Sequence, residues 1–214
     1  MSLRSVMDLL FASSNPHKLD EVRAVLAPLG VRVAGLDELN RAIEEPVEDG
    51  ATFEDNARIK AMAYARESGR LCLADDSGLE VDALGGQPGV HSARYAGVGT
   101  TRAERDHANN AKLLAALRGV PQRERTARFV CAMCLADASG RVLAEARGEF
   151  EGVITDQPRG SNGFGYDPLL LLPEEGRTSA ELSPEEKNAR SHRGAAARLI
   201  ALKLREIGLL QRAE

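Results

Sequence analysis

The feature that most constrains the fold is an alternation of short apolar runs with stretches of helical periodicity. The run VMDLLFAS (6–13) predicts a first strand. Asn15 and Pro16 then mark a helix start, because Asn accepts hydrogen bonds at an N-cap and Pro fits the first helical position. The pattern continues with helical spacing to about 29, a strand at 31–35, a helix from Thr52 to Ser68 and a strand at 70–74. Strands alternating with helices predict an α/β fold.

The second half of the chain adds a strand pair and three helices. Two apolar stretches, 127–137 and 141–154, predict neighbouring strands around a turn at 138–140, which makes the expected sheet mixed. We expect a helix over 101–118 with Ala108, Ala111, Leu114 and Leu117 on its apolar face, a short helix after Ser183 that is interrupted at 191–193, and a last helix to about 209. No repeat divides the chain, so we expect one domain over 1–214.

Charge and cysteine usage limit the classes of function. A net charge of −4 over 214 residues does not favour a nucleic-acid-binding protein, which usually has a basic face. No apolar run approaches the ~20 residues that span a bilayer, and Asp8 interrupts the apolar N-terminal run where a signal peptide would continue. Three cysteines in apolar surroundings are typical of a reducing compartment. We therefore expect a cytoplasmic protein that binds neither membrane nor nucleic acid.

The motif SSNPHK (13–18) lies where the first strand ends and the first helix begins. Free N–H groups and the positive end of the helix dipole favour a phosphate at such a position. Ser13, Ser14 and Asn15 add donors, and Lys18 adds a positive charge. The alternative is an ordinary helix cap followed by a solvated lysine.

Asp75 and Asp76 end the predicted strand at 70–74. Ligands of α/β proteins bind beyond the carboxyl ends of strands, and carboxylates there are natural ligands for Mg²⁺. Because side chains alternate along an extended chain, we expect one aspartate to face a ligand and the other to have a supporting role. The alternative is an Asx-type turn before Ser77. The acidic stretch 44–49 could supply a second metal ligand, but the residues alone do not choose among its four carboxylates.

Two further stretches carry candidate binding residues. In SNGFGYDP (161–168), glycines allow a close approach of the backbone while Phe164 and Tyr166 offer stacking faces; the alternative is a loop whose aromatic rings enter the core. In KNARSHRG (187–194), Lys187, His192 and Arg193 could donate hydrogen bonds to keto oxygens or phosphates, or lie on an ordinary surface. The CxxC of Cys131 and Cys134 falls within a predicted strand, which directs the two sulfurs to opposite faces and disfavours a redox or zinc role.

Five stretches in this order resemble the inosine/xanthosine triphosphate pyrophosphatase family, enzymes that remove non-canonical purine nucleotides. They are FASSNPHKLDEV, TFEDNARIKA, ADDSGLEVDALGGQPGVHSARYAG, GSNGFGYDP and AELSPEEKNARSHRG, which together extend over nearly the whole chain. The family's first motif more often has Thr-Gly-Asn where this chain has Ser13, Ser14 and Asn15.

The resemblance implies an elongated mixed sheet flanked by helices, two lobes with a central substrate cleft, and a homodimer. It implies Mg²⁺-dependent hydrolysis of ITP, dITP, XTP and dXTP to the monophosphate and pyrophosphate, which keeps these nucleotides out of DNA and RNA. It implies that Asp76 binds the metal and acts as general base, with Asp75 beside it and Glu48 as the further metal ligand. The substrate-binding residues implied are Ser13, Ser14, Asn15, Pro16, His17, Lys18, Lys60, Ser77, Phe164, Gly165, Tyr166, Asp167, Lys187, His192 and Arg193. The alternatives are a pyrophosphatase of similar fold for pyrimidine or modified nucleotides, other divalent ions in place of Mg²⁺, and a nucleotide sensor without catalysis.

Overall fold

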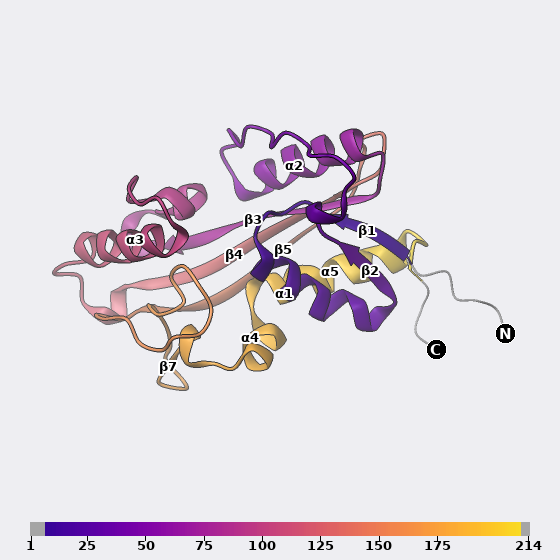
Figure 1. The fold of residues 1–214 in the computed structure, drawn as a ribbon. Coiled ribbons are helices and arrows are strands. Elements are labelled where there is room, and N and C mark those ends of the chain that lie inside the picture. The colour runs from indigo at the N-terminus through magenta and orange to yellow at the C-terminus, as the bar shows by residue number, and fades with distance from the viewer. Residues whose placement is uncertain (1–6, 211–214) are drawn as a thin grey trace. The chain divides into compact units, whose positions relative to one another are not determined.

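The computed structural model describes residues 7–210, in which one mixed sheet of seven strands has the order β2-β1-β3-β4-β5-β6-β7 (Figure 1). The strands are β1 (Met7–Phe11), β2 (Val31–Ala34), β3 (Cys72–Val81), β4 (Thr126–Ala136), β5 (Val142–Ile154), β6 (Leu170–Leu172) and β7 (Arg177–Thr178). β1 is parallel to β2 and β3, whereas β6 is antiparallel to β5 and β7. The α/β class and the mixed sheet are therefore confirmed, and only Val6 of the first predicted strand lies outside the described residues.

Five α-helices accompany the sheet in the described part of the chain. They are α1 (Pro16–Leu26), α2 (Phe53–Ser68), α3 (Arg102–Ala116), α4 (Pro184–Arg190) and α5 (His192–Glu206). The predicted caps are confirmed: Asn15 accepts from the His17 N–H, Thr52 from Asp55 and Ser183 from Glu186. None of these helices is long and apolar enough to cross a membrane.

The chain divides into two compact units, each built from separate segments. Of the described residues, unit 1 contains 7–76, 131–148 and 192–210, and unit 2 contains 77–130 and 149–191. Strands β3, β4 and β5 contribute residues to both units, so neither unit is a continuous piece of chain.

In unit 1, α1 and α5 lie side by side against one face of the strands, and α2 lies on the opposite face (Figure 1). The core on the α1 and α5 side joins Leu9 and Phe11 of β1 with Val22, Leu26 and Ile200 of the two helices. All five side chains are fully buried. Since β1 ends at Phe11, the start of α1 directly follows its carboxyl end.

In unit 2, the predicted apolar face of α3 is confirmed in part, because Leu114 and Leu117 pack in the core of this unit. The buried positions of α3 are Asn109 and Leu113, whereas Ala111 is exposed. The Asn109 amide explains the difference: it accepts a hydrogen bond from the Ala96 N–H at 2.7 Å and donates to the Ser92 carbonyl at 3.2 Å. A polar side chain with buried backbone partners can occupy the inward face of a helix, and hydrophobic spacing does not reveal it.

Two other boundaries differ from expectation. β3 continues through Asp75 and Asp76 to Val81, so these residues are neither the end of a strand nor an Asx turn. At the C-terminal end, only Ser191 separates α4 from α5, and His192 and Arg193 form the first turn of α5. This start places the Arg193 side chain inside unit 1, where it is fully buried.

Candidate active site

The side chains of Asp75 and Asp76 lie on opposite faces of β3, as strand alternation predicts. Asp75 points toward α1 and α5: its Oδ1 is 3.1 Å and its Oδ2 3.0 Å from Lys18 Nζ, and Oδ2 is 3.1 Å from Arg193 Nε. The Cys131 thiol donates a weak hydrogen bond to the same carboxylate at 3.7 Å. Asp75 is 1% exposed, so two cations neutralise a carboxylate that is removed from water.

Asp76 points toward α2. Its Oδ2 accepts a hydrogen bond of 3.0 Å from the Asn56 amide, and its Oδ1 is 3.6 Å from Lys60 Nζ. Lys60 also forms a 2.7 Å ion pair with Glu48. Unlike Asp75, the Asp76 carboxylate keeps part of its surface accessible, with 13% of the side chain exposed.

The two environments shift the carboxyl pKa values in opposite directions. Burial alone would raise the pKa of Asp75, but the charges of Lys18, Arg193 and Lys60 together hold this pKa well below its usual range. For Asp76 burial is the largest influence and raises the pKa, against the charges of Lys60 and Lys18. Burial would lower the pKa of Lys60, yet the charges of Asp76, Asp75 and Glu48 raise it. Asp75 is thus held as an anion, and Asp76 has more affinity for a proton than an ordinary aspartate.

The predicted phosphate motif forms the start of α1. Ser13 Oγ accepts a hydrogen bond of 3.3 Å from the Asn15 N–H, and Asn15 Oδ1 caps the helix through the His17 N–H at 3.1 Å. Ser14, Pro16 and His17 are exposed, whereas Lys18 is half-buried because it turns toward Asp75. The motif is therefore a real N-cap, and it also carries a lysine whose position is set by a buried carboxylate.

Glu48 and Asp76 are the residues of this group that fit a magnesium ion. Lys60 Nζ contacts both carboxylates, so one positive charge already lies between them. Of the four acidic residues at 44–49, Glu48 is the only one whose side chain is not exposed. Within residues 7–210, no three His, Cys, Asp or Glu side chains form a complete metal cage. Two carboxylates agree with Mg²⁺ chemistry, since Mg²⁺ commonly takes one or two carboxylates with substrate phosphates and water.

Unit 2 holds the other group of predicted residues around the glycine-rich loop. Asp167 is 2% exposed, and its Oδ2 accepts from the Phe164 N–H at 2.8 Å and forms a 2.6 Å ion pair with Lys187. The Ser179 hydroxyl donates to Asp167 Oδ1 at 2.7 Å. Phe164 remains half-buried, with Lys187 Nζ 5.1 Å from the centre of its ring. Asp167 therefore fixes the backbone of the loop and the position of Lys187.

Four other predicted substrate-binding residues differ from one another in their surroundings. Tyr166 belongs to the core of unit 2, where its hydroxyl donates to the Ser92 carbonyl at 2.9 Å, so the core alternative holds for this ring. Arg193 is an ion-pair partner of Asp75 and of Glu21. His192 is buried at the start of α5, and Ser77 is partly exposed in β3.

Sequence reasoning missed several residues that hold these groups in place. Asn56, Glu21 and Cys131 are absent from the predicted set, although each contacts a predicted residue. Asn56 is four residues before Lys60 on α2, and Glu21 is three residues after Lys18 on α1. Helical spacing from a charged candidate was therefore the available signal for two of them. Cys131 reaches Asp75 only through strand pairing, for which the sequence offered no signal.

Comparison with known proteins shows the family to which the chain belongs. The Ham1 family model matches residues 9–202, so the chain belongs to the Ham1 family. A protein of Desulforamulus reducens named dITP/XTP pyrophosphatase is 51% identical over 190 residues, covering 89% of this chain and 92% of its own. A Ham1 protein structure from Coxiella burnetii has a TM-score of 0.79 and 41% identity, covering 94% of this chain and 99% of its own. The crystal structure of a nucleoside-triphosphatase / dITP/XTP pyrophosphatase from Mycobacterium abscessus has a TM-score of 0.72 and 46% identity, covering 91% of this chain and 98% of its own.

Proposed function

We propose that the protein hydrolyses dITP, XTP and the related triphosphates ITP and dXTP to the nucleoside monophosphate and pyrophosphate. The observation that carries this proposal is the pair of oppositely placed aspartates on β3, each with its own lysine. The names of relatives about half identical to this chain support the substrate class.

In the proposed reaction, water attacks the α-phosphorus and pyrophosphate leaves with the electrons of the broken P–O bond. Asp76 accepts the proton of the attacking water, a role that suits a partly accessible carboxylate whose pKa is raised. Lys18 and Lys60 bind the phosphates, with the N–H groups at the start of α1 as further donors. Asp75 holds Lys18 in position.

We further propose that Glu48 and Asp76 bind Mg²⁺. When bound, the ion neutralises phosphate charge and lowers the barrier to attack on phosphorus. Lys60 contacts both carboxylates in this structure, and we assign its ammonium group to the substrate phosphates. Asp75 has a supporting role in this assignment, since both of its oxygens face cations.

For the nucleoside, we propose that Phe164 stacks on the base and that Lys187 contacts the nucleoside next to it. A site built on hydrogen bonds can reject a wrong base strongly, and donors favour the 6-keto group of hypoxanthine and xanthine over the 6-amino group of adenine. His192 is a candidate donor.

The homodimer and the cytoplasmic location are also proposals. The three cysteines are free and buried, which agrees with a reducing compartment. Light scattering of the purified protein tests the dimer.

The deciding experiment is a panel of triphosphates with product identification. ITP, XTP, ATP, GTP, dTTP and UTP are incubated with the enzyme and Mg²⁺, and the products are separated by chromatography. We expect IMP and XMP with pyrophosphate from the first two and at least about tenfold lower kcat/KM for ATP, dTTP and UTP, while GTP, which also has a 6-keto group, measures the effect of the 2-amino group. Release of single phosphates would refute the reaction, preference for dTTP or UTP would refute the substrate class, and tight binding of ITP without product would indicate a sensor.

A further inference from the structure

The loop that carries Phe164 adopts an unusual backbone conformation that other groups must hold. Phe164 lies between Gly163 and Gly165, whose φ angles are 77° and 62°. Both values lie in the left-handed region that favours glycine. A Cβ on Gly163 would lie 2.1 Å from Asp167 Oδ2, so the loop also packs closely on Asp167. The direction of the Phe164 ring therefore depends on what binds the peptide groups beside it.

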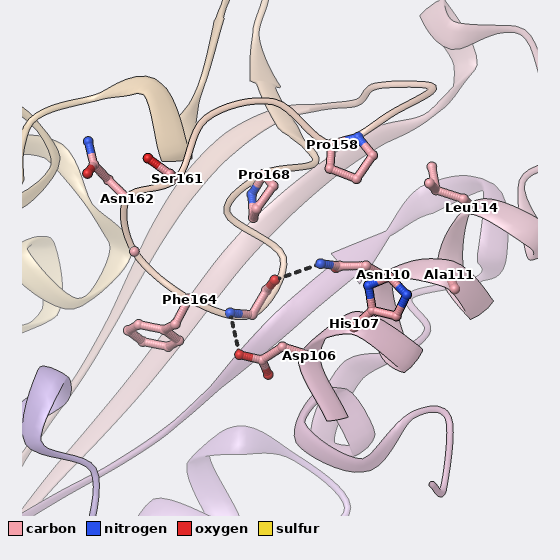
Figure 2. Close-up of a pocket in the computed structure, with 12 residues that line it drawn as sticks. Asp106, His107, Asn110, Ala111, Leu114, Pro158, Ser161, Asn162, Phe164 and Pro168 are labelled. Atoms are coloured by element: carbon pink, nitrogen blue, oxygen red, sulfur yellow. Dashed lines mark hydrogen bonds between the residues drawn. The ribbon is translucent and has the colours of Figure 1, made fainter. Parts of the chain in front are cut away.

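Helix α3 binds both peptide groups of Gly165. Asp106 Oδ2 accepts the Gly165 N–H at 3.0 Å, and the Asn110 amide donates to the Gly165 carbonyl at 3.0 Å. Figure 2 shows the two side chains reaching the loop from successive turns of the helix. Their spacing of four residues puts them on one helical face, and the two bonds together fix the orientation of the Gly165 backbone.

A third residue of the same face contacts the ring itself. Arg102 is one turn before Asp106, and its guanidinium carbon lies 4.5 Å from the centre of the Phe164 ring. Its Nε is 3.8 Å from Asp106 Oδ2, so the carboxylate that holds the loop also orients the cation on the ring. A cation on an aromatic face is a stabilising contact.

We propose that Arg102, Asp106 and Asn110 are positioning residues for nucleotide recognition, and that they hold the Phe164 ring in the orientation that stacks on a purine base. This inference rests on the proposed role of Phe164. Asp167 accepts a hydrogen bond from the Phe164 N–H, and Asp106 of α3 accepts one from the Gly165 N–H. The peptide groups before and after Phe164 are therefore both fixed, and they set the direction of the ring. A ring that is already oriented loses less conformational freedom when the base binds.

The chain also offers a pocket next to these contacts. It has a volume of about 510 Å³ and is lined by α3 on one side and by the Phe164 loop on the other (Figure 2). Ala111 and Leu114 of the predicted apolar face line this pocket, and Leu114 also packs against the core of unit 2 as predicted. Among the described residues that line the pocket, Asp106 and Asn110 are the only ones on α3 that form hydrogen bonds with Gly165. Loss of either leaves open space into which the loop can relax.

The test compares two substitutions of Asp106 with a control on the neighbouring residue. Asp106→Ala removes the acceptor, whereas Asp106→Asn keeps a side-chain oxygen for the Gly165 N–H. His107→Ala changes a residue that lines the same pocket. We expect Asp106→Ala to raise KM for ITP about tenfold with kcat within twofold, because stacking is equal in the bound substrate and the transition state. Asp106→Asn and His107→Ala should stay within about threefold of the parent KM.

A second measurement reports on the ring directly. The chain contains no tryptophan, so Phe164→Trp creates a single tryptophan at the proposed stacking position, and its fluorescence can be excited apart from that of the three tyrosines. We expect IMP to quench its emission, and Asp106→Ala in this background to weaken IMP binding about tenfold. If Asp106→Ala does not fold, Asn110→Ala provides the same comparison from the other hydrogen bond.

The outcomes separate this inference from the proposed function. Unchanged KM and unchanged IMP affinity in both α3 variants, together with a raised KM in Phe164→Ala, would overturn the inference alone. A fall in kcat at constant KM in the α3 variants would also overturn the inference, because that result would indicate a general loss of structure. An unchanged KM in Phe164→Ala would instead refute the role of Phe164 in the proposed function.

Discussion

The neighbouring residues Asp75 and Asp76 of β3 lie in contrasting environments on the two faces of the strand. On the α1 and α5 side, Asp75 is fully enclosed by two cations that hold it as an anion. On the α2 side, Asp76 has one lysine at a longer distance and an amide, and it retains some exposure. Burial disfavours the charged form of both carboxylates. The nearby cations outweigh this effect at Asp75, whose pKa is lowered, but not at Asp76, whose pKa is raised.

The difference teaches that burial of a carboxylate does not by itself indicate its role. A carboxylate whose charge is compensated supports structure, because its partners would be left unpaired without it. One whose charge is incompletely compensated retains the capacity to bind a proton or a cation. The first description fits Asp75 and the second fits Asp76, so the two sides of β3 can be separated by experiment.

The largest expected effect is on catalysis by Asp76→Asn. The substitution keeps the side-chain shape but removes the proposed proton acceptor and a metal ligand, so kcat should fall on the order of 10³–10⁴-fold. The free energy of unfolding should stay constant or rise, because burial of the charged form is unfavourable in the folded protein. Steady-state kinetics with ITP and urea denaturation check both parts. An active Asp76→Asn enzyme would remove Asp76 from the proposed mechanism.

The matching substitution on the other side, Asp75→Asn, should act mainly on stability. It leaves Arg193, which is fully buried, and Lys18 without their shared carboxylate. Removing one partner of a buried ion pair costs about 3–5 kcal/mol. Urea denaturation at neutral pH measures this loss, and Asp76→Asn serves as the matched control. Equal stability of the two variants would contradict the division of roles along β3.

Stabilisation by Mg²⁺ also distinguishes Asp75 from Asp76, with a smaller expected effect than the two substitutions above. Mg²⁺ at ten times its dissociation constant should stabilise the folded protein by about 1.4 kcal/mol, which is about 3–6 °C in Tm for a chain of this length. We expect this shift to disappear in Glu48→Gln and Asp76→Asn and to persist in Asp75→Asn. The Tm with and without Mg²⁺, without nucleotide, gives the readout. A shift that survives in both Glu48→Gln and Asp76→Asn would place the metal elsewhere.

Local signals explain why much of the fold could be predicted. Asn15 with Pro16 and Thr52 with Asp55 define helix starts through their own hydrogen-bonding chemistry, and the structure confirms both. The inward position of Asn109 on α3 could not be predicted in this way. Asn109 is buried because its partners come from the segment 92–96, and such partners are specified only by the tertiary structure.

The candidate site shows the same limit. Alternation along β3 was enough to predict that Asp75 and Asp76 face opposite ways. It could not predict that Arg193, 118 residues away along the chain, would be the partner of Asp75. On the residues alone, the acidic stretch 44–49 likewise had four equivalent carboxylates, and the structure distinguishes Glu48 by its ion pair with Lys60 of α2. Long-range pairing of charges depends on packing, which residue spacing does not encode.

The smallest expected effect is the pH dependence of stability, and its sign differs between the two aspartates. The pKa of Asp75 is lowered from 3.8, so its contribution to stability is present above this value and is lost as the pH falls toward the folded pKa. The pKa of Asp76 is raised from 3.8, so the folded protein binds more protons above this value, and stability falls as the pH rises through that window. One proton changes the free energy by at most about 1.4 kcal/mol per pH unit. Urea midpoints should therefore show the deficit of Asp75→Asn growing as the pH rises toward about 3.8 and constant above it, whereas Asp76→Asn gains on the parent protein as the pH rises above about 3.8. Slopes of the same sign would show that the two carboxylates share one environment, and the comparison along β3 would fail.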